Sequence, residues 1–158
     1  MTVPGRAGTV DAAPGRSAMI AALDRAGERV TRPRRTVAGL VADRDGYFTA
    51  AELVADARRQ GLGIGRATIF RALDLFTGLG LVERVDLPEG AHAYVACEGA
   101  HHHHAICTSC GRSLDVDDAG LAEVLRRIGD RSGFRVTTHR LEVFGVCGAC
   151  LAAEGDAA

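Results

Sequence analysis

The residues with the clearest chemical role are four cysteines, arranged as two Cys-x-x-Cys pairs far apart in the sequence. One pair is Cys107 and Cys110, and the other is Cys147 and Cys150. Four thiolates complete the tetrahedral shell that Zn²⁺ takes at structural sites, so the two pairs predict a structural zinc on these residues. Two redox-active dithiols or two disulfides are the alternative interpretations of the same spacing.

Four consecutive histidines, His101, His102, His103 and His104, precede the first cysteine pair and offer further metal ligands. In an extended strand, successive side chains point to opposite faces. His101 and His103 would then face one way, and His102 and His104 the other. One strand would therefore supply ligands to two different metal sites.

Composition and charge favour a globular chain with a basic first half. The chain has 158 residues, of which 47% are hydrophobic, enough for one large domain or two small ones. Residues 1–86 hold 13 Arg against 10 Asp and Glu, a net charge of +3, and residues 87–158 hold 6 Arg against 10 Asp and Glu, a net charge of −4. The basic half is the better candidate for contact with nucleic acid.

Residues 1–16 are rich in Gly, Ala, Pro and Arg and have no apolar signal core, so we interpret them as a disordered tail. No apolar run approaches the roughly 20 residues of a membrane span. We therefore expect a cytoplasmic protein without membrane association. Its thiols would stay reduced, which favours metal over disulfides. Cys97 remains unpaired once the four zinc cysteines are assigned.

The first half of the chain predicts a series of short helices. Ser17 suits the cap of a first helix, and Pro33 suits the first turn of a second. Thr49 and Glu52 have the form of a capping box that opens a third. A fourth helix is expected from Gly65.

The fourth predicted helix, residues 65–76, has two distinct faces, and a hairpin follows it. The apolar face carries Ile69, Ala72, Leu73 and Phe76. The opposite face carries Ala67 and Arg71, and Arg66, Thr68 and Phe70 flank it. Residues 81–87 and 91–97 predict two strands joined by the turn Pro88-Glu89-Gly90. Helices followed by a hairpin are typical of a winged helix-turn-helix, whose last helix enters the major groove of DNA. A solvated helix surface is the simpler interpretation of the polar face.

The second half predicts a small α/β unit. Asp117 or Asp118 is a candidate cap for a helix with apolar residues on one side, Leu121, Val124, Leu125 and Ile128. Residues 134–144 predict a strand whose apolar phase shifts, so either both faces are covered or a bulge intervenes. A unit this thin is barely stable alone, and we expect it to dimerise through this strand.

Taken together, these motifs resemble the ferric uptake regulator family of bacterial metal-sensing repressors. The match runs from about Ser17 to Cys150. It rests on Val30-Thr31-x-Pro33-Arg34, on Ala67-Thr68-Ile69-Phe70-Arg71-Ala72-Leu73, on Gly80-Leu81-Val82, on the histidine run with Cys107-x-x-Cys110-Gly111, and on Gly133-Phe134 and His139-x-Leu141-Glu142 with Cys147-x-x-Cys150.

The resemblance implies an α+β fold, with an N-terminal winged helix-turn-helix followed by a small α/β dimerisation domain with a structural zinc. Metal bound between the two would set the DNA-binding shape. The implied divisions are a winged-helix DNA-binding domain at 17–87, the wing end and hinge at 88–100, and a metal-binding dimerisation domain at 101–151, between tails at 1–16 and 152–158.

The resemblance also implies a hinge regulatory site. Zinc uptake regulators of this family carry a Cys where iron regulators usually carry a Glu, and Cys97 stands at that position. The implied ligands are Glu83, Cys97, His102 and His104. Tyr47 replaces a His that iron regulators often use as a ligand, which argues against iron.

A second regulatory site is implied on His101, His103 and His139. The Glu that normally completes it is Ala122 here, so the adjacent Glu123 is the expected substitute. The DNA-contact candidates are Arg34, Arg66, Ala67, Thr68, Phe70 and Arg71. Phe70 stands where a Tyr is usual, which removes a hydroxyl donor.

Ligand chemistry favours zinc at the hinge. A shell of one thiolate, two imidazoles and one carboxylate suits Zn²⁺ better than Mn²⁺ or Fe²⁺, which prefer more oxygen ligands. We therefore expect a zinc-responsive transcriptional repressor of metal uptake and homeostasis genes. It would bind an inverted-repeat operator in double-stranded DNA as a homodimer and would not be an enzyme.

Other functions remain as alternatives. An iron, manganese, nickel or peroxide sensor of the same family is the nearest one. A zinc hydrolase with Glu123 as base is remote, because the chain has no His-Glu-x-x-His run. A zinc-stapled interaction module without DNA binding is equally remote.

Overall fold

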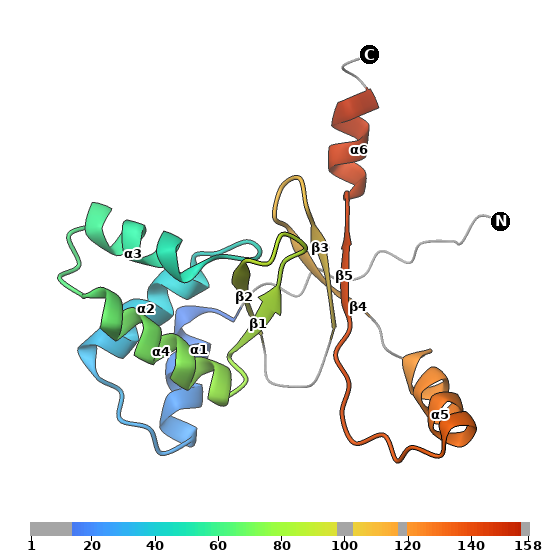
Figure 1. Ribbon diagram of the computed structural model, residues 1–158. Coiled ribbons are helices and arrows are strands. Elements are labelled where there is room, and N and C mark those ends of the chain that lie inside the picture. Colours follow the sequence, from blue (N-terminus) through green and yellow to red (C-terminus); the bar gives the residue numbers. More distant parts are fainter. Residues whose placement is uncertain (1–13, 98–102, 117–119, 156–158) are drawn as a thin grey trace.

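The computed structural model describes residues 14–97, 103–116 and 120–155. A helical N-terminal part, a two-stranded hairpin and a C-terminal sheet follow one another along the chain (Figure 1). This arrangement confirms the expected α+β class. His101, His102, both candidate caps Asp117 and Asp118, and most of the two tails lie outside the described residues.

The N-terminal helices begin and end close to the positions that their capping residues predict. They are α1 (Arg16–Arg25), α2 (Arg32–Ala42), α3 (Ala50–Arg59) and α4 (Arg66–Gly78). The Thr31 hydroxyl accepts the Arg34 N–H at the start of α2, with Pro33 in the first turn. The capping box of Thr49 and Glu52 is confirmed at the start of α3.

The first helix starts earlier than predicted. Its cap is Gly15 rather than Ser17, and Ser17 lies inside the first turn. The carbonyl of Gly15 already accepts the Met19 N–H at 3.1 Å. An extended Gly15 can therefore begin the helix two residues before the hydroxyl side chain.

The helices and the hairpin enclose a hydrophobic core. The predicted apolar face of α4 is buried. It packs in one cluster with side chains from α1, α2, α3, the segment before α3 and the hairpin, including Met19, Leu23, Val37, Val41, Phe48, Leu53 and Val82. The hairpin consists of β1 (Val82–Asp86) and β2 (His92–Ala96), paired antiparallel from Val82–Ala96 to Asp86–His92. The structure thus confirms the predicted helices followed by a wing.

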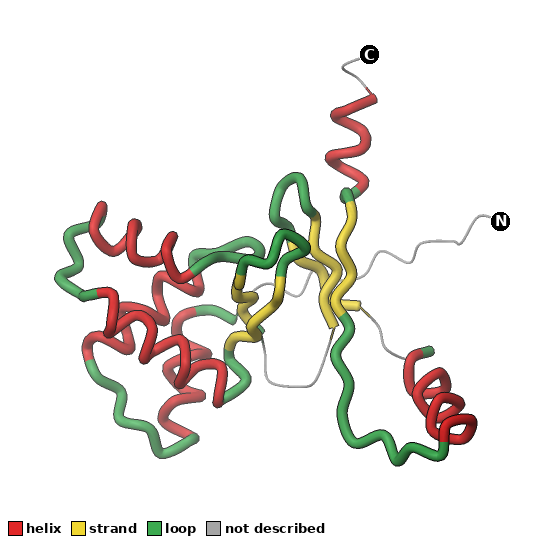
Figure 2. Tube along the Cα trace, in the orientation of Figure 1, coloured by secondary structure: helices red, strands yellow, loops and turns green. Residues whose placement is uncertain are grey.

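The C-terminal part is built on a short sheet with strand order β4-β3-β5 (Figure 2). Its strands are β3 (His103–Cys107), β4 (Ser113–Val116) and β5 (Glu142–Gly145), and its helices are α5 (Leu121–Ser132) and α6 (Gly148–Gly155). Strand β4 pairs antiparallel to β3, and β5 pairs parallel to it.

The predicted strand 134–144 is much shorter in the structure. Only Glu142–Gly145 forms a strand, and residues 134–141 have no regular structure. Strand β3 offers β5 backbone partners only from His104 to Cys107. Within the described parts of the chain, the residues upstream of Glu142 therefore have no strand partner.

Many apolar side chains of the C-terminal part are exposed in the single chain. Helix α5 lies away from the sheet (Figure 1) and buries none of its residues within the described chain. The exposed set is Val124, Ile128, Phe134, Val136, Leu141, Val143, Val146 and Leu151, with Phe134 74% exposed. Apolar surface of this extent usually marks an interface with another chain. Separately, none of the helices in the described ranges combines the length and apolar character of a membrane span.

The two parts of the chain are in direct contact. Val85, Leu87, Ala93 and Val95 of the hairpin region pack with Ile106 of β3, flanked by Tyr47 and Phe144. Hydrogen bonds also cross the same junction. The Tyr47 N–H donates to the Gly111 carbonyl at 3.1 Å, and Arg140 Nη2 donates to the Arg84 carbonyl at 2.8 Å.

The junction leaves no room for a side chain at Gly46. A Cβ added there would lie 2.2 Å from the Gly111 carbonyl oxygen, and the φ of Gly46 is outside the left-handed region. Gly46→Ala should therefore disturb only this junction, at a cost of about 1–3 kcal/mol by overpacking. We expect the Tyr47 amide to exchange its hydrogen roughly ten to a hundred times faster, as nuclear magnetic resonance would measure.

Gly78→Ala is the matched control, because a Cβ at Gly78 would meet no atom within 4 Å. It should leave the exchange of the Tyr47 amide unchanged. Equal exchange rates in the wild type and in Gly46→Ala would show that the two parts are not held together at this point.

Candidate functional site

The four cysteines of the two Cys-x-x-Cys pairs meet at one end of the C-terminal sheet. Their sulfurs all lie within 4.8 Å of one another, with Cys107 Sγ 3.9 Å from Cys150 Sγ and Cys110 Sγ 3.8 Å from Cys147 Sγ. The parallel pairing of β3 and β5 sets Cys107 opposite Gly145, so both strands deliver their cysteines to the same end.

These distances fit a zinc site and not disulfides. Disulfide sulfurs lie about 2.05 Å apart, whereas all five cysteines here are free thiols. Four sulfurs placed tetrahedrally at about 2.3 Å from a Zn²⁺ would be separated by roughly 3.8 Å. The spacing of the cluster is therefore that of a Cys₄ structural zinc site.

Hydrogen bonds prepare part of this cluster for ionisation. The backbone N–H of Cys147 donates to Cys107 Sγ at 3.3 Å, and this bond is the main reason why the pKa of Cys107 falls to about 6. Contact with the Cys147 side chain raises the pKa of Cys150 to about 12. Ionisation of all four neighbouring thiols would bring four negative charges together, so it requires a cation among them.

A second group of donor atoms lies at the junction between the hairpin and the sheet. Glu83 on β1, Cys97 just after β2 and His104 on β3 place their donor atoms within 4.8 Å of one another. His104 Nε2 is 3.4 Å from Glu83 Oε2 and 3.5 Å from Cys97 Sγ. The structure brings together three of the four predicted hinge ligands, and the fourth, His102, lies outside the described residues.

The hinge group is mostly withdrawn from water. His104 is 2% exposed and Cys97 5% exposed, while the Glu83 side chain is 39% exposed. Burial, aided by the negative charge of Glu83, raises the pKa of the Cys97 thiol to about 12. Cys97 is therefore protonated near neutral pH, and a metal that binds its sulfur must displace that proton.

The neighbouring histidine of β3 contacts a different residue. His103 is 2% exposed, and its Nε2 lies 2.9 Å from His139 Nε2. Adjacent histidines of the strand thus point to different partners, as strand alternation predicts. The structure pairs two of the four residues proposed for the second site, and His101 lies outside the described residues.

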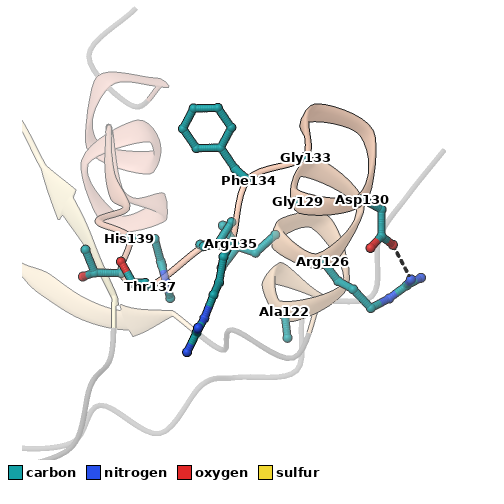
Figure 3. Close-up of a pocket in the computed structure, with 12 residues that line it drawn as sticks. Ala122, Arg126, Gly129, Asp130, Gly133, Phe134, Arg135, Thr137 and His139 are labelled. Atoms are coloured by element: carbon teal, nitrogen blue, oxygen red, sulfur yellow. Dashed lines mark hydrogen bonds and ion pairs between the residues drawn. The ribbon is translucent and has the colours of Figure 1, made fainter.

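Within the described residues, Glu123 does not lie with the other candidates for this second site. Glu123 accepts two hydrogen bonds from Arg126, at 3.0 Å and 2.7 Å, on an exposed face of α5. Among the described residues, it joins no group of potential ligands with the two histidines. The hollow that includes His139 is lined instead by Ala122 (Figure 3), because one helical step turns the Glu123 side chain away by about 100°.

The DNA-contact candidates on α4 lie together on its outer side. Arg66, Ala67 and Arg71 are exposed, and Thr68 and Phe70 are half-buried. The Arg66 guanidinium lies 5.2 Å from the centre of the Phe70 ring. These two residues and Ala67 line a shallow hollow on the surface of α4.

Arg34 is placed differently from the other candidates. Its Nη1 donates to Glu28 Oε2 at 3.0 Å and to the Arg29 carbonyl at 2.6 Å. These bonds hold the loop before α2, so Arg34 has a structural role within this chain.

Sequence reasoning missed two partners of histidine side chains. Asp115 Oδ1 lies 3.2 Å from His104 Nδ1, and Asp86 Oδ1 lies 2.6 Å from His92 Nδ1. Both pairs form across antiparallel strands. The pair of Asp86 and His92 was foreseeable from the register of the hairpin. The pair of Asp115 and His104 depends on how a loop returns β4 to β3.

Comparison with known proteins agrees with this geometry. The sequence model of the ferric uptake regulator family matches residues 25–144. The zinc uptake regulation protein of Mycobacterium tuberculosis H37Rv is 34% identical over 128 residues, covering 81% of this chain and 98% of that protein. The ferric uptake regulation protein of Escherichia coli K12 is 33% identical over 136 residues, covering 85% of this chain and 88% of that protein.

Solved structures show the same likeness. A zinc uptake regulator in complex with zinc and DNA has a TM-score of 0.74 at 25% identity, covering 89% of this chain and 95% of the other. The zinc uptake regulator XcZur in its holo form has a TM-score of 0.69 at 28% identity, covering 87% and 96%. The matched relatives are regulators and not enzymes. The chain therefore belongs to the ferric uptake regulator family of metal-responsive DNA-binding regulators.

Proposed function

We propose that this protein is a zinc-responsive transcriptional repressor of genes for metal uptake and homeostasis. The observation that carries the proposal is the buried group of Glu83, Cys97 and His104 at the junction of the two parts. A thiolate beside an imidazole and a carboxylate favours Zn²⁺ over Fe²⁺ and Mn²⁺. His102 would be the fourth ligand. Such a regulator would act in the cytoplasm.

The remaining metal ligands are assigned on the same basis. Cys107, Cys110, Cys147 and Cys150 would hold a structural zinc. His103 and His139, with His101, would form a second regulatory site of lower affinity, since Glu123 is engaged with Arg126.

The position of the hinge group explains how metal could control DNA binding. Glu83 and Cys97 belong to the hairpin that follows α4, whereas His104 belongs to the sheet of the C-terminal part. A bound ion would supply the positive charge that holds these three side chains together. The protein without metal would sample several orientations of α4, and the metal-bound protein would favour the one that fits its operator.

The repressor would bind as a homodimer through the C-terminal part. The exposed apolar set of α5 and residues 134–151 supplies the surface for the second copy. Two copies related by a twofold axis present two α4 helices to DNA. We expect the dimer to protect an inverted repeat with half-sites about one helical turn apart, in contrast to a single half-site.

Two substitutions on α4 should separate base recognition from general affinity. Phe70→Ala removes the apolar surface beside Ala67, so it should lower discrimination between operator and mutated operator by about 1–3 kcal/mol. Arg71→Ala should weaken binding to all duplexes and lower the salt dependence by about one released counterion. Fluorescence anisotropy with both duplexes at several salt concentrations measures each effect. Arg25→Ala, at an exposed position on α1, is the charge control.

The metal that the protein senses can be determined directly. Operator binding by the dimer should be titrated against buffered free Zn²⁺, Fe²⁺ and Mn²⁺. We expect zinc to promote binding at the lowest free concentration. An iron-responsive repressor is the alternative, because relatives named ferric uptake regulation proteins match almost as well as zinc regulators do. Activation by Fe²⁺ below the effective Zn²⁺ concentration would select that alternative.

A further inference from the structure

The first turn of α4 carries a cation where the helix itself disfavours one. Arg66 is the first residue of α4, and the preceding cap, Gly65, makes no side-chain hydrogen bond. The N-terminal end of a helix has a partial positive charge, so a basic side chain there is destabilising. The first turn has no acidic residue to offset it, and none of the ion pairs in the described parts of the chain involves Arg66. Helix stability therefore gives no reason for an arginine at this position.

The Arg66 side chain is nevertheless held in place by an aromatic ring. Its guanidinium carbon lies over the Phe70 ring, 5.2 Å from the ring centre. Phe70 is half-buried and packs against the hydrophobic core of the helices, whereas Arg66 is exposed. A guanidinium is planar and carries its N–H groups in that plane, so stacking one face on a ring leaves those donors available to other acceptors. The core thus fixes the ring, and the ring orients the guanidinium.

The chemistry of an oriented guanidinium matches one DNA base in particular. In the major groove, guanine presents two adjacent acceptors, O6 and N7, which accept two parallel N–H groups from an arginine. Adenine presents an acceptor beside a donor, thymine a single acceptor and cytosine a donor. The N-terminal residues of a recognition helix are those that approach base edges, and Arg66 is the first residue of α4. A side chain that is already oriented also loses less freedom on binding.

We propose that Arg66, stacked on Phe70, reads a guanine in each half-site of the operator. The inference rests on the proposed repressor function and adds the base that one end of α4 recognises. Phe70 acts here as a positioning residue for the guanidinium. The alternative role of Arg66 is a phosphate contact, which would carry no sequence information.

Selection of duplexes from a randomised pool tests the proposal with the full-length, zinc-loaded dimer. The wild type should select an inverted repeat with a guanine at one position of each half-site. Arg66→Ala should lose that preference by about 5- to 100-fold and keep the preferences at other positions. Arg25→Ala, which removes an exposed charge from α1, should select the same guanine as the wild type. The melting temperature of Arg66→Ala should not fall, because the substitution removes an unfavourable charge from the helix end.

A modified base and a second substitution test the contact itself. Replacing the selected guanine by 7-deazaguanine removes the N7 acceptor, so it should weaken binding of the wild type and leave binding of Arg66→Ala unchanged. Phe70→Leu keeps an apolar side chain but removes the ring, and it should lower the preference for guanine by about 2- to 5-fold. In the Arg66→Ala background, Phe70→Leu should have no further effect at that guanine, because the two residues act as one unit.

Three results would contradict these expectations in different ways. If Arg66→Ala weakens binding to all duplexes equally and lowers the salt dependence by about one counterion, Arg66 is a phosphate contact and the inference is wrong. If Phe70→Leu has the same effect at the guanine with and without Arg66, the ring does not position the guanidinium. If the zinc-loaded wild type selects no inverted repeat, the proposed function itself is wrong.

Discussion

Cys107→Ser is expected to remove the structural zinc and most of the dimer. Cys107 ends β3, and the three other cysteine sulfurs surround its thiol. It also accepts the Cys147 N–H that ties the β5–α6 connection to β3. Binding of structural Zn²⁺ contributes roughly 10–16 kcal/mol in small zinc-dependent folds, so its loss exceeds the stability of an ordinary domain.

Zinc content after dialysis, sedimentation and thermal unfolding measure this outcome. Cys150→Ser should behave in the same way, because Cys150 completes the same cluster. Cys97→Ser is the control and should keep the structural zinc and the dimer. A Cys107→Ser protein that stayed dimeric with wild-type melting would show that the cluster does not hold a structural zinc.

Cys97→Ser is expected to shift the free zinc needed for operator binding upward by about one to two decades. The substitution removes one of the proposed hinge ligands, and a single ligand contributes a few kcal/mol, at about 1.4 kcal/mol per decade. Because Cys97 is not one of the four clustered cysteines, the dimer should persist. The measurement is operator binding against buffered free zinc.

His101→Ala and His103→Ala should shift the same midpoint less. Within the described residues, Glu123 pairs with Arg126 and does not join their proposed site. If Cys97→Ser left the free zinc needed for operator binding unchanged while His101→Ala abolished the response to zinc, the sensing site would lie on the other face of β3.

The raised pKa of Cys97 adds a dependence on pH to the same experiment. The thiol, with a pKa of about 12, is protonated at pH 7–8, and zinc binds the thiolate. Each bound zinc should therefore release about one proton from Cys97, so the apparent zinc affinity rises by about tenfold per pH unit. Cys97→Ser should lose most of this slope, which chelator competition at pH 7 and pH 8 would detect.

Most of the N-terminal elements were predictable because their signals are local. The capping box of Thr49 and Glu52 spans four residues, and the apolar face of α4 repeats at the helical period. The hairpin joins neighbouring strands through a tight turn. The length of β5 was not predictable, because it depends on how many residues of the distant β3 are available for pairing.

For the metal sites, the sequence alone determined the ligand types and the alternation of the histidines. The spacing of a Cys-x-x-Cys pair and the two faces of a strand are properties of short segments, so His103 and His104 had to point to different partners. Only the tertiary structure decided which distant groups meet these ligands. The placement of Asp115 behind His104 depends on the register of β4 against β3. By contrast, the pair of Glu123 and Arg126 joins positions i and i+3 of one helix, which is a local pattern that the sequence itself contains.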